Sequence, residues 1–217
     1  MTAPEPRAIE TVVFDIGGVL LDWDPRHLYR KVFDDEAAME AFLGRVCTPA
    51  WHAPHDRGAS TADSCARLVE AHPGHREEIW AWMTRGEEMV AGSIDESVEI
   101  LAELHRSGVA CYALSNMEAE TFPRRRQRFA FFAVFDGIVI SGNEGVAKPD
   151  PAIFELLLRR FRLDARTTLF IDDNAVNLAP ASALGMATVL FESPEGLRRA
   201  LHEADLLPGD PGDRLPA

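Results

Sequence analysis

The sequence predicts an α/β protein with a doubly wound parallel sheet and a helical insert after the first strand. Short apolar runs alternate with segments of helical periodicity through most of the chain. This alternation is typical of a parallel sheet with right-handed crossovers and helices on both faces. It is interrupted once, by roughly 70 residues after the first apolar run, which is far longer than an ordinary connection.

Five apolar runs are predicted to form the strands of the sheet. They are 11–16, 109–115, 135–141, 167–173 and 186–191, and the helical segments between the later ones are 95–107, 118–129, 151–161 and 174–185. Turn and cap residues agree with this division, because Gly108 and Gly185 end two helices and Pro151 opens another. Ligands of an open parallel sheet bind at the carboxyl ends of its strands. The residues at those ends are therefore the first candidates for a site.

The long interruption is predicted to be a helical insert covering residues 24–92. It contains helical runs around 35–46, 61–71 and 75–91 but no good strand run. We expect it to lie above the carboxyl end of the first strand, where it would act as a lid over a site. The core would then comprise 1–23 and 93–217, with 205–217 as a loose tail rich in proline, glycine and aspartate.

The composition excludes several classes of protein. The chain has 217 residues and a net charge of -13, which argues against nucleic-acid binding. No window is apolar enough for a membrane span and the N-terminus has no signal pattern, so a cytoplasmic protein is expected. Cys47, Cys65 and Cys111 are odd in number and lack a CxxC pair, which indicates buried reduced thiols. The basic run "RRRQR" (124–128) is interpreted as a solvated helix face, with a partner or substrate contact as the alternative.

Polar residues that could form a site stand where four of the apolar runs end. They are Asp15 after the first run, Ser115 and Asn116 after the second, Lys148 after the third, and Asp172, Asp173 and Asn174 after the fourth. Adjacent carboxylates at a buried strand end repel one another unless a cation or a proton lies between them. The set could hold a hard divalent cation among its carboxylates and an anion near its hydroxyl, amide and ammonium groups.

Lys148 also stands out by composition. Of the 22 basic residues, only Lys31 and Lys148 are lysines. The chain thus uses arginine for its ordinary positive charges, and a lysine indicates a role that arginine does not fill.

Four segments in this order resemble the motifs of the haloacid dehalogenase superfamily: "VVFDIGGVL", "ALSN", "AKPD" and "FIDDNAVNL". The resemblance runs from about residue 11 to 193 and implies a Rossmann-like core with a helical cap, that of capped subfamily I. The segment "WHAPHDRGAST" in the insert is similar to the cap of a branch that includes a glucose 1-phosphate phosphatase and the phosphatase domain of soluble epoxide hydrolase.

The resemblance implies a magnesium-dependent phosphatase that acts on a small phosphorylated molecule, such as a sugar phosphate. Asp15 would be the nucleophile that carries an aspartyl phosphate, and Ser115, Asn116 and Lys148 would bind the phosphoryl group. Magnesium would be held by Asp15, the carbonyl of Gly17 and Asp173, with support from Asp172 and Asn177. Trp51, His52 and His55 of the insert would be candidates for substrate contact. The pattern specifies neither the particular substrate nor an oligomeric state.

One position departs from the family pattern. Phosphatases of this superfamily usually have a second aspartate two residues after the nucleophile, where it transfers a proton, and this chain has Gly17. Three interpretations remain open. The first is a phosphatase whose leaving group needs little protonation or whose acid comes from elsewhere, with His52, His55 and Asp56 as candidates by position. The second is a metal-free 2-haloacid dehalogenase that uses Asp15 as a carbon nucleophile, against which the paired acids of "FIDDN" argue. The third is a non-catalytic module that binds a phosphorylated ligand.

Overall fold

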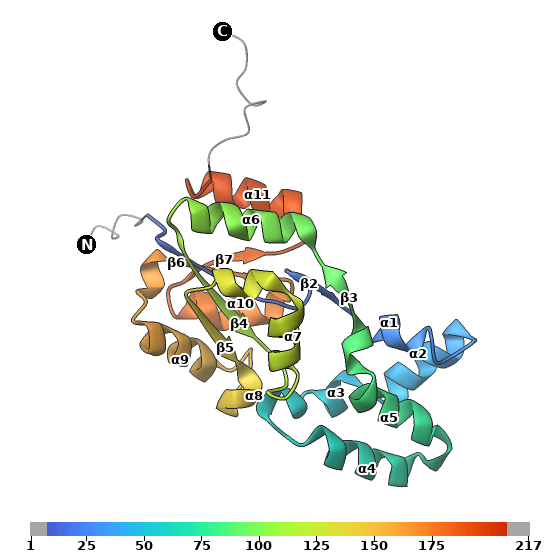
Figure 1. The fold of residues 1–217 in the computed structure, drawn as a ribbon. Coiled ribbons are helices and arrows are strands. Elements are labelled where there is room, and N and C mark those ends of the chain that lie inside the picture. The colour runs from blue at the N-terminus through green and yellow to red at the C-terminus, as the bar shows by residue number, and fades with distance from the viewer. Residues whose placement is uncertain (1–7, 208–217) are drawn as a thin grey trace.

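The protein is an α/β fold built on a parallel sheet of five strands, as the sequence predicts. The structure, a computed structural model, describes residues 8–207. The strand order is β5-β4-β1-β6-β7, and every neighbouring pair is parallel. The strands are β1 (Thr11–Phe14), β4 (Ala110–Ser115), β5 (Gly137–Ile140), β6 (Thr168–Asp172) and β7 (Ala187–Leu190). Because β1 lies between β4 and β6, the residues that follow these three strands meet at one edge of the sheet (Figure 1).

Helices cover both faces of the sheet. They are α6 (Asp95–Arg106), α7 (Phe122–Arg128), α8 (Ser141–Glu144), α9 (Pro151–Phe161), α10 (Ala175–Ala183) and α11 (Pro194–Glu203). Side chains alternate between the faces along β1, as the pleat requires. Val12 and Phe14 belong to the apolar cluster that includes α6 and α11, whereas Val13 belongs to the cluster of α9 and α10. All three are fully buried, which explains why this strand reads as a continuous apolar run.

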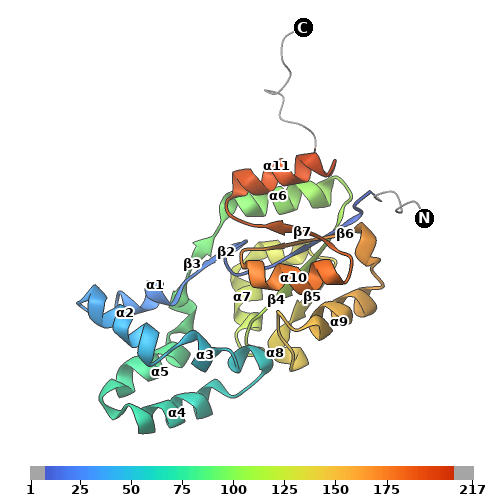
Figure 2. The same ribbon diagram turned by 180° about the vertical axis from the view of Figure 1, so that it is seen from behind.

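The chain between β1 and α6 forms a helical unit with an apolar cluster of its own. Its helices are α1 (Pro25–Tyr29), α2 (Glu36–Arg45), α3 (Pro49–His52), α4 (Thr61–Ala71) and α5 (Arg76–Thr84). Tyr29, Phe42 and Ile79 are among the residues that fill its centre. These helices lie together at one end of the molecule (Figures 1 and 2). Two antiparallel strands, β2 (Leu21–Trp23) and β3 (Val90–Ser93), connect this unit to the sheet.

Three expectations about local structure are wrong. The helix expected over 75–91 ends at Thr84, a 3-10 turn covers Gly86–Met89, and the chain then forms β3. This strand is only four residues long and contains Gly92, so its pairing with β2 rather than a local pattern defines it. The helix expected over 118–129 is shortened to α7, which begins at Phe122 with a proline in its first turn.

The third concerns the C-terminal segment. The expected loose tail, 205–217, begins too early, because Leu206 and Leu207 are buried against the core. They follow α11, which the sequence pattern does not predict. The rest of that tail, from 208 onward, lies outside the described residues.

Candidate active site

The strand-end residues singled out in the sequence converge at the carboxyl edge of the sheet. Asp15 follows β1, Ser115 ends β4 and Asp172 ends β6. Lys148 comes from the loop between α8 and α9 and reaches two of these groups: its Nζ lies 2.9 Å from Oδ1 of Asp15 and 2.7 Å from Oδ2 of Asp172. The Lys148 side chain is 1% exposed, so the ammonium group is held between two carboxylates away from solvent.

Lys148 and Lys31 illustrate two uses of a lysine in this chain. Lys31 makes a surface ion pair with Glu88 at 3.0 Å and its side chain is 55% exposed. Lys148 is buried, which by itself lowers its pKa, but Asp15 and Asp172 outweigh that effect and raise it. The Lys148 ammonium therefore stays charged, and its compact shape fits between two anions where a planar guanidinium would not.

Asp15 is a buried carboxylate whose pKa is set by opposing effects. Burial raises its pKa to about 7, Lys148 opposes that change, and Asp172 adds to it. Its Oδ1 accepts a hydrogen bond from the backbone N–H of Ile16 at 2.7 Å and also faces Lys148. Both contacts fall on Oδ1, so Oδ2 is left without either of them.

Asp172 and Asp173 are adjacent but differently placed. Asp172 is fully buried and accepts hydrogen bonds from Lys148, from the Nδ2 of Asn177 at 2.9 and 3.1 Å, and from the backbone N–H of Asn174 at 2.8 Å. Asp173 is exposed and lines the cavity described below. Asp172 thus fixes Lys148 and Asn177, whereas the carboxylate of Asp173 remains open to a ligand.

Three of these acids offer oxygen ligands close together. One carboxylate oxygen each from Asp15, Asp172 and Asp173 lies within 4.8 Å of the others. Burial raises the pKa of Asp173, and the negative charge of Asp172 raises it further. The repulsion between the two acids is thus not fully offset by the positive charge of Lys148. Carboxylate oxygens grouped in this way match the donor preference of magnesium.

The two glycines after Asp15 have different structural reasons. Gly18 has a φ of +75°, and a Cβ at this position would lie 2.6 Å from Cγ of Asp173, so a side chain would displace that carboxylate. A Cβ on Gly17 would meet nothing within 4 Å, and its φ lies outside the left-handed range. The fold therefore requires glycine at 18 but leaves room for a side chain at 17.

The side chains of Ser115 and Asn116 make different contacts. Ser115 is 2% exposed and lines the cavity next to Asp15 and Lys148. The side chain of Asn116 bonds the backbone of Lys148 on both sides: its Nδ2 donates to the carbonyl at 2.9 Å, and its Oδ1 accepts from the N–H at 2.9 Å. Asn116 thereby holds the lysine loop in place. It also lines the cavity, and since an amide nitrogen has two hydrogens, the phosphoryl contact expected from the sequence stays a prediction.

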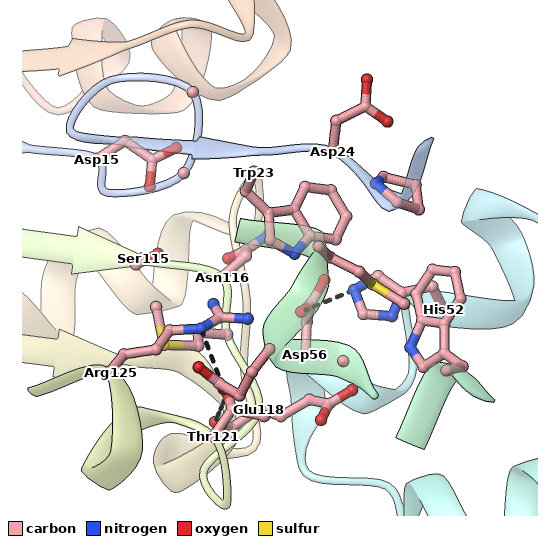
Figure 3. A pocket seen from close by; sticks show the side chains of 18 of the residues that line it. Asp15, Trp23, Asp24, His52, Asp56, Ser115, Asn116, Glu118, Thr121 and Arg125 are labelled. Carbon is pink, nitrogen blue, oxygen red and sulfur yellow. Dashed lines mark hydrogen bonds and ion pairs between the residues drawn. The ribbon is translucent and has the colours of Figure 1, made fainter. Parts of the chain in front are cut away.

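These residues form the floor of a cavity of about 510 Å³ between the sheet edge and the insert. Trp23, His52 and Asp56 also line it (Figure 3), as does Trp82. Of the insert residues expected to contact substrate, His52 lines the cavity but Trp51 and His55 do not. Trp51 packs edge-on against Trp82, with ring centroids 5.2 Å apart.

Arg125 lies on the cavity wall, where the alternative interpretation of the basic run, a substrate contact, would place it. It lies in the basic run expected to be a solvated helix face, yet its side chain is only 11% exposed and lines the cavity. Burial lowers its pKa, while Glu87, at 3.9 Å, and Glu118 oppose that effect. The sequence does not single out Arg125 within its run of arginines, because it differs from Arg124 and Arg126 in burial, which the sequence does not show.

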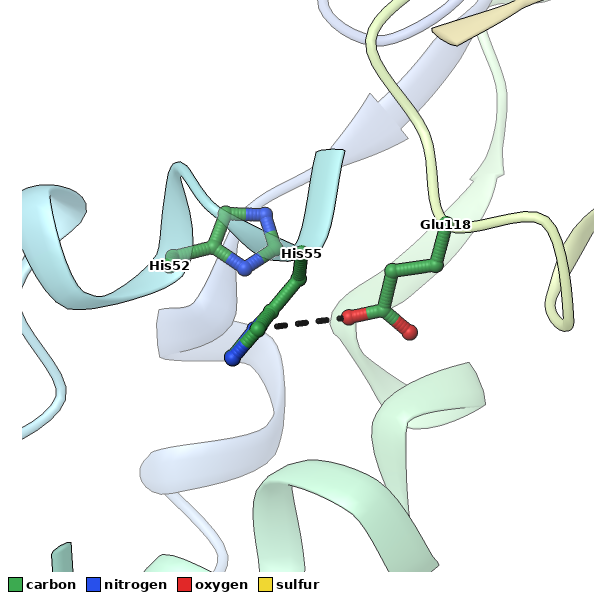
Figure 4. Close-up of side chains that lie close together, drawn as sticks. All are labelled: His52, His55 and Glu118. Carbon is green, nitrogen blue, oxygen red and sulfur yellow. Dashed lines mark ion pairs between the residues drawn. The ribbon is translucent and has the colours of Figure 1, made fainter. Parts of the chain in front are cut away.

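A cluster of His52, His55 and Glu118 lies where the insert meets the loop after β4 (Figure 4). Nδ1 of His55 is 3.8 Å from Oε1 of Glu118, and Nε2 of His52 is 3.5 Å from Oδ1 of Asp56. Burial lowers the pKa of both histidines, that of His52 to about 4. Both imidazoles are therefore uncharged at neutral pH, and their contacts with the acids are not ion pairs.

Comparison with known proteins identifies the class of this site. The family model of the haloacid dehalogenase-like hydrolases matches residues 9–185, and the chain belongs to this family of hydrolases. It is 29% identical over 177 residues to a sesquiterpene phosphatase of Aspergillus oryzae, with 82% of this chain and 87% of that protein covered. Three further curated relatives are longer proteins, of which the chain spans 36% or less.

Solved structures of the family share the fold. A Bacteroides thetaiotaomicron enzyme of the haloacid dehalogenase family, in complex with magnesium and phosphate, has a TM-score of 0.63 at 20% identity and covers 85% of this chain and 94% of its own. The L-2-haloacid dehalogenase of Xanthobacter autotrophicus also has a TM-score of 0.63 at 20% identity, with 92% and 85% covered. Because this fold is shared by a dehalogenase and by an enzyme that binds magnesium and phosphate, the fold alone does not choose between dehalogenase and phosphatase chemistry, and the site residues must do so. Within the described part of the chain, no helix has the length and apolar character needed to cross a membrane.

Proposed function

We propose that this hydrolase is a magnesium-dependent phosphatase that cleaves a small organic phosphate through a phosphorylated Asp15. The observation that carries this proposal is the buried contact of Lys148 with both Asp15 and Asp172 beside the open carboxylate of Asp173. An acid ready to attack, a fixed positive charge and a second acid for a cation are the parts that phosphoryl transfer through a carboxylate requires.

The donor set fits magnesium. Asp15, Asp173 and the backbone carbonyl of Gly17 would hold the ion, because all are oxygen donors and Gly18 lets the carboxylate of Asp173 lie close to this turn. Asp172 and Asn177 would support the site, since Nδ2 of Asn177 donates hydrogen bonds to the Asp172 carboxylate. Bound magnesium would neutralise negative charge on the phosphoryl oxygens and orient them for attack.

The residues would divide the reaction as follows. Asp15 attacks phosphorus through Oδ2, a new oxygen–phosphorus bond forms, and the bond to the leaving oxygen breaks. Lys148 and Ser115 bind the phosphoryl oxygens, while Asn116 keeps Lys148 in register. Water then attacks phosphorus, which releases inorganic phosphate and restores the Asp15 carboxylate.

The organic part of the substrate would occupy the outer cavity. Trp23 and Trp82 provide flat apolar surfaces there, and Arg125 and Asp56 provide polar ones. The similarity to a sesquiterpene phosphatase supports an organic phosphate with an apolar portion. The resemblance of the segment "WHAPHDRGAST" to the sugar-phosphatase branch supports a sugar phosphate. The proposed substrate is therefore a small organic phosphate, and one experiment compares these two kinds.

The experiment is a phosphate-release assay with aryl, sugar and prenyl phosphates, each with magnesium and with chelator. Halide release from 2-haloacids is measured in parallel. Magnesium-dependent phosphate release supports the proposal. Halide release that persists with chelator would replace it with dehalogenation, and no turnover of any compound would reject an enzymatic role for the site.

A further inference from the structure

The proposed reaction lacks a proton donor at the position where one is usual. Gly17 has no side chain, so nothing at this turn can protonate the departing oxygen or take a proton from water. General acid–base help is typically worth about 10²–10⁴ in rate. A phosphatase that acts on alkyl phosphates would need this help from another part of the cavity wall.

Two other acids on the cavity wall are held by arginine side chains. Asp24 caps α1 by accepting from the backbone N–H of Arg26 at 2.8 Å, and the Arg26 guanidinium lies 3.4 Å from the same oxygen. Glu87 lies 3.9 Å from Arg125 and its side chain is 32% exposed. Both acids thus already have an arginine partner, and Glu87 is also open to water.

Asp56 has a different environment. It belongs to the 3-10 turn His55–Arg57 of the insert, its side chain is 15% exposed, and it lines the cavity into which Asp15 opens. Figure 3 shows its carboxyl group in the cavity beside His52. Because the His52 ring is uncharged at neutral pH, this contact does not hold Asp56 in its ionised form. Glu118 also lines the cavity and burial raises its pKa, but a hydrogen bond from Thr61 and the charge of Arg125 oppose that shift. Its nearest imidazole is that of His55, at 3.8 Å (Figure 4).

The surroundings of Asp56 suit a group that both gives and takes a proton. Burial raises its pKa to about 6, and the negative charge of Glu118 adds to this shift. The charges of Lys148, Arg57 and Arg125 oppose it. Lys148, whose charge acts on Asp56, also contacts Asp15, and the two acids line the same cavity. A carboxyl group with a pKa near the working pH exchanges protons most effectively.

We propose that Asp56 is the catalytic acid and base that replaces the missing side chain at Gly17, an inference that rests on the proposed phosphatase function. In the first step the Asp56 carboxyl group gives its proton to the leaving oxygen as the bond from that oxygen to phosphorus breaks. The alcohol departs and Asp15 carries the phosphoryl group. In the second step the Asp56 carboxylate takes a proton from water as the water oxygen bonds to phosphorus. Inorganic phosphate leaves, and both side chains return to their starting state.

The test compares leaving groups in the Asp56→Asn variant. An alkyl phosphate, such as a sugar phosphate with a primary alcohol leaving group, needs protonation, whereas p-nitrophenyl phosphate leaves as a stable anion. In Asp56→Asn we expect kcat for the alkyl phosphate to fall by about 10²–10⁴, with a much smaller loss for formation of the phosphoenzyme from p-nitrophenyl phosphate. Asp63→Asn, on the exposed face of α4 in the same insert, is the matched control and should behave as wild type.

A second variant separates catalysis from structure. The open space at Gly17 admits an aspartate, so Gly17→Asp in the Asp56→Asn background should restore turnover of the alkyl phosphate. A loss in Asp56→Asn that is equal for both leaving groups and is not restored by Gly17→Asp would overturn the inference, as would full activity of Asp56→Asn. Failure of the proposed function looks different, because the wild-type protein would then release no phosphate from either compound.

Discussion

Substitution of Gly18 by alanine tests the role of the glycine turn. The φ of +75° at this position lies in the left-handed region, which costs about 1–2 kcal/mol for a residue with a Cβ. The new methyl group would lie 2.6 Å from Cγ of Asp173, whereas carbon atoms make contact at about 3.5–4.0 Å. The Asp173 side chain must therefore move by about 1 Å. Magnesium keeps its oxygen ligands at about 2.0–2.1 Å, so in the proposed metal site a shift of that size would remove Asp173 from the ion.

The expected result is a split between stability and metal dependence. Gly18→Ala should lower the free energy of unfolding by about 1–2 kcal/mol, measured by urea denaturation. It should also raise the magnesium concentration for half-maximal phosphate release by at least about tenfold. Gly17→Ala is the matched control for stability, because its Cβ meets nothing within 4 Å. If Gly18→Ala and Gly17→Ala gave the same stability and the same magnesium dependence, the structural account of this turn would be refuted.

Two further predictions concern buried charge and buried histidine. Lys148→Met leaves Asp15 and Asp172 buried without their shared cation. The free energy of unfolding, measured by urea denaturation, should therefore fall by about 3 kcal/mol, and phosphate release should fall by at least about 100-fold. Unchanged stability would contradict the buried arrangement. His52 has a folded pKa of about 4 against an ordinary value of 6.5, so only the unfolded chain takes up a proton between these values and stability falls as the pH drops through this window. From pH 7 to 5 this contribution is about 2 kcal/mol, and His52→Gln should lose less stability than wild type over the same range; equal pH dependence of the two proteins would refute the assignment.

The sheet and its edge residues were predictable because they depend on local patterns. Strand β1 is buried on both faces and therefore appears as an unbroken apolar run that ends at Asp15. Parallel strands bring their carboxyl ends to one edge, so the proximity of Asp15, Ser115 and Asp172 follows from the order of the strands alone. The rarity of lysine singled out Lys148, and the structure places it between two acids.

The cavity wall was less predictable because it depends on contacts between distant segments. Strand β3 is defined by its pairing with β2, and no local periodicity indicates it. The sequence offers Asp56 as a candidate proton donor and the basic run as a possible substrate contact. No local pattern shows, however, that Asp56 and Arg125 line the same cavity from elements almost 70 residues apart. The hydrogen bonds of Asn116 with the Lys148 backbone could not be predicted either, because they depend on how two loops approach each other.

The most direct test of the account is to find where the phosphoryl group is attached during turnover. Wild-type protein and Asp15→Asn are mixed with magnesium and substrate, quenched in acid within one turnover, and digested for mass spectrometry. If Asp15 is the nucleophile, the wild-type peptide containing Asp15 gains the mass of one phosphoryl group, and Asp15→Asn, although folded, shows neither this gain nor phosphate release. Phosphate release by Asp15→Asn at the wild-type rate, or a phosphoryl group on another residue, would contradict the account.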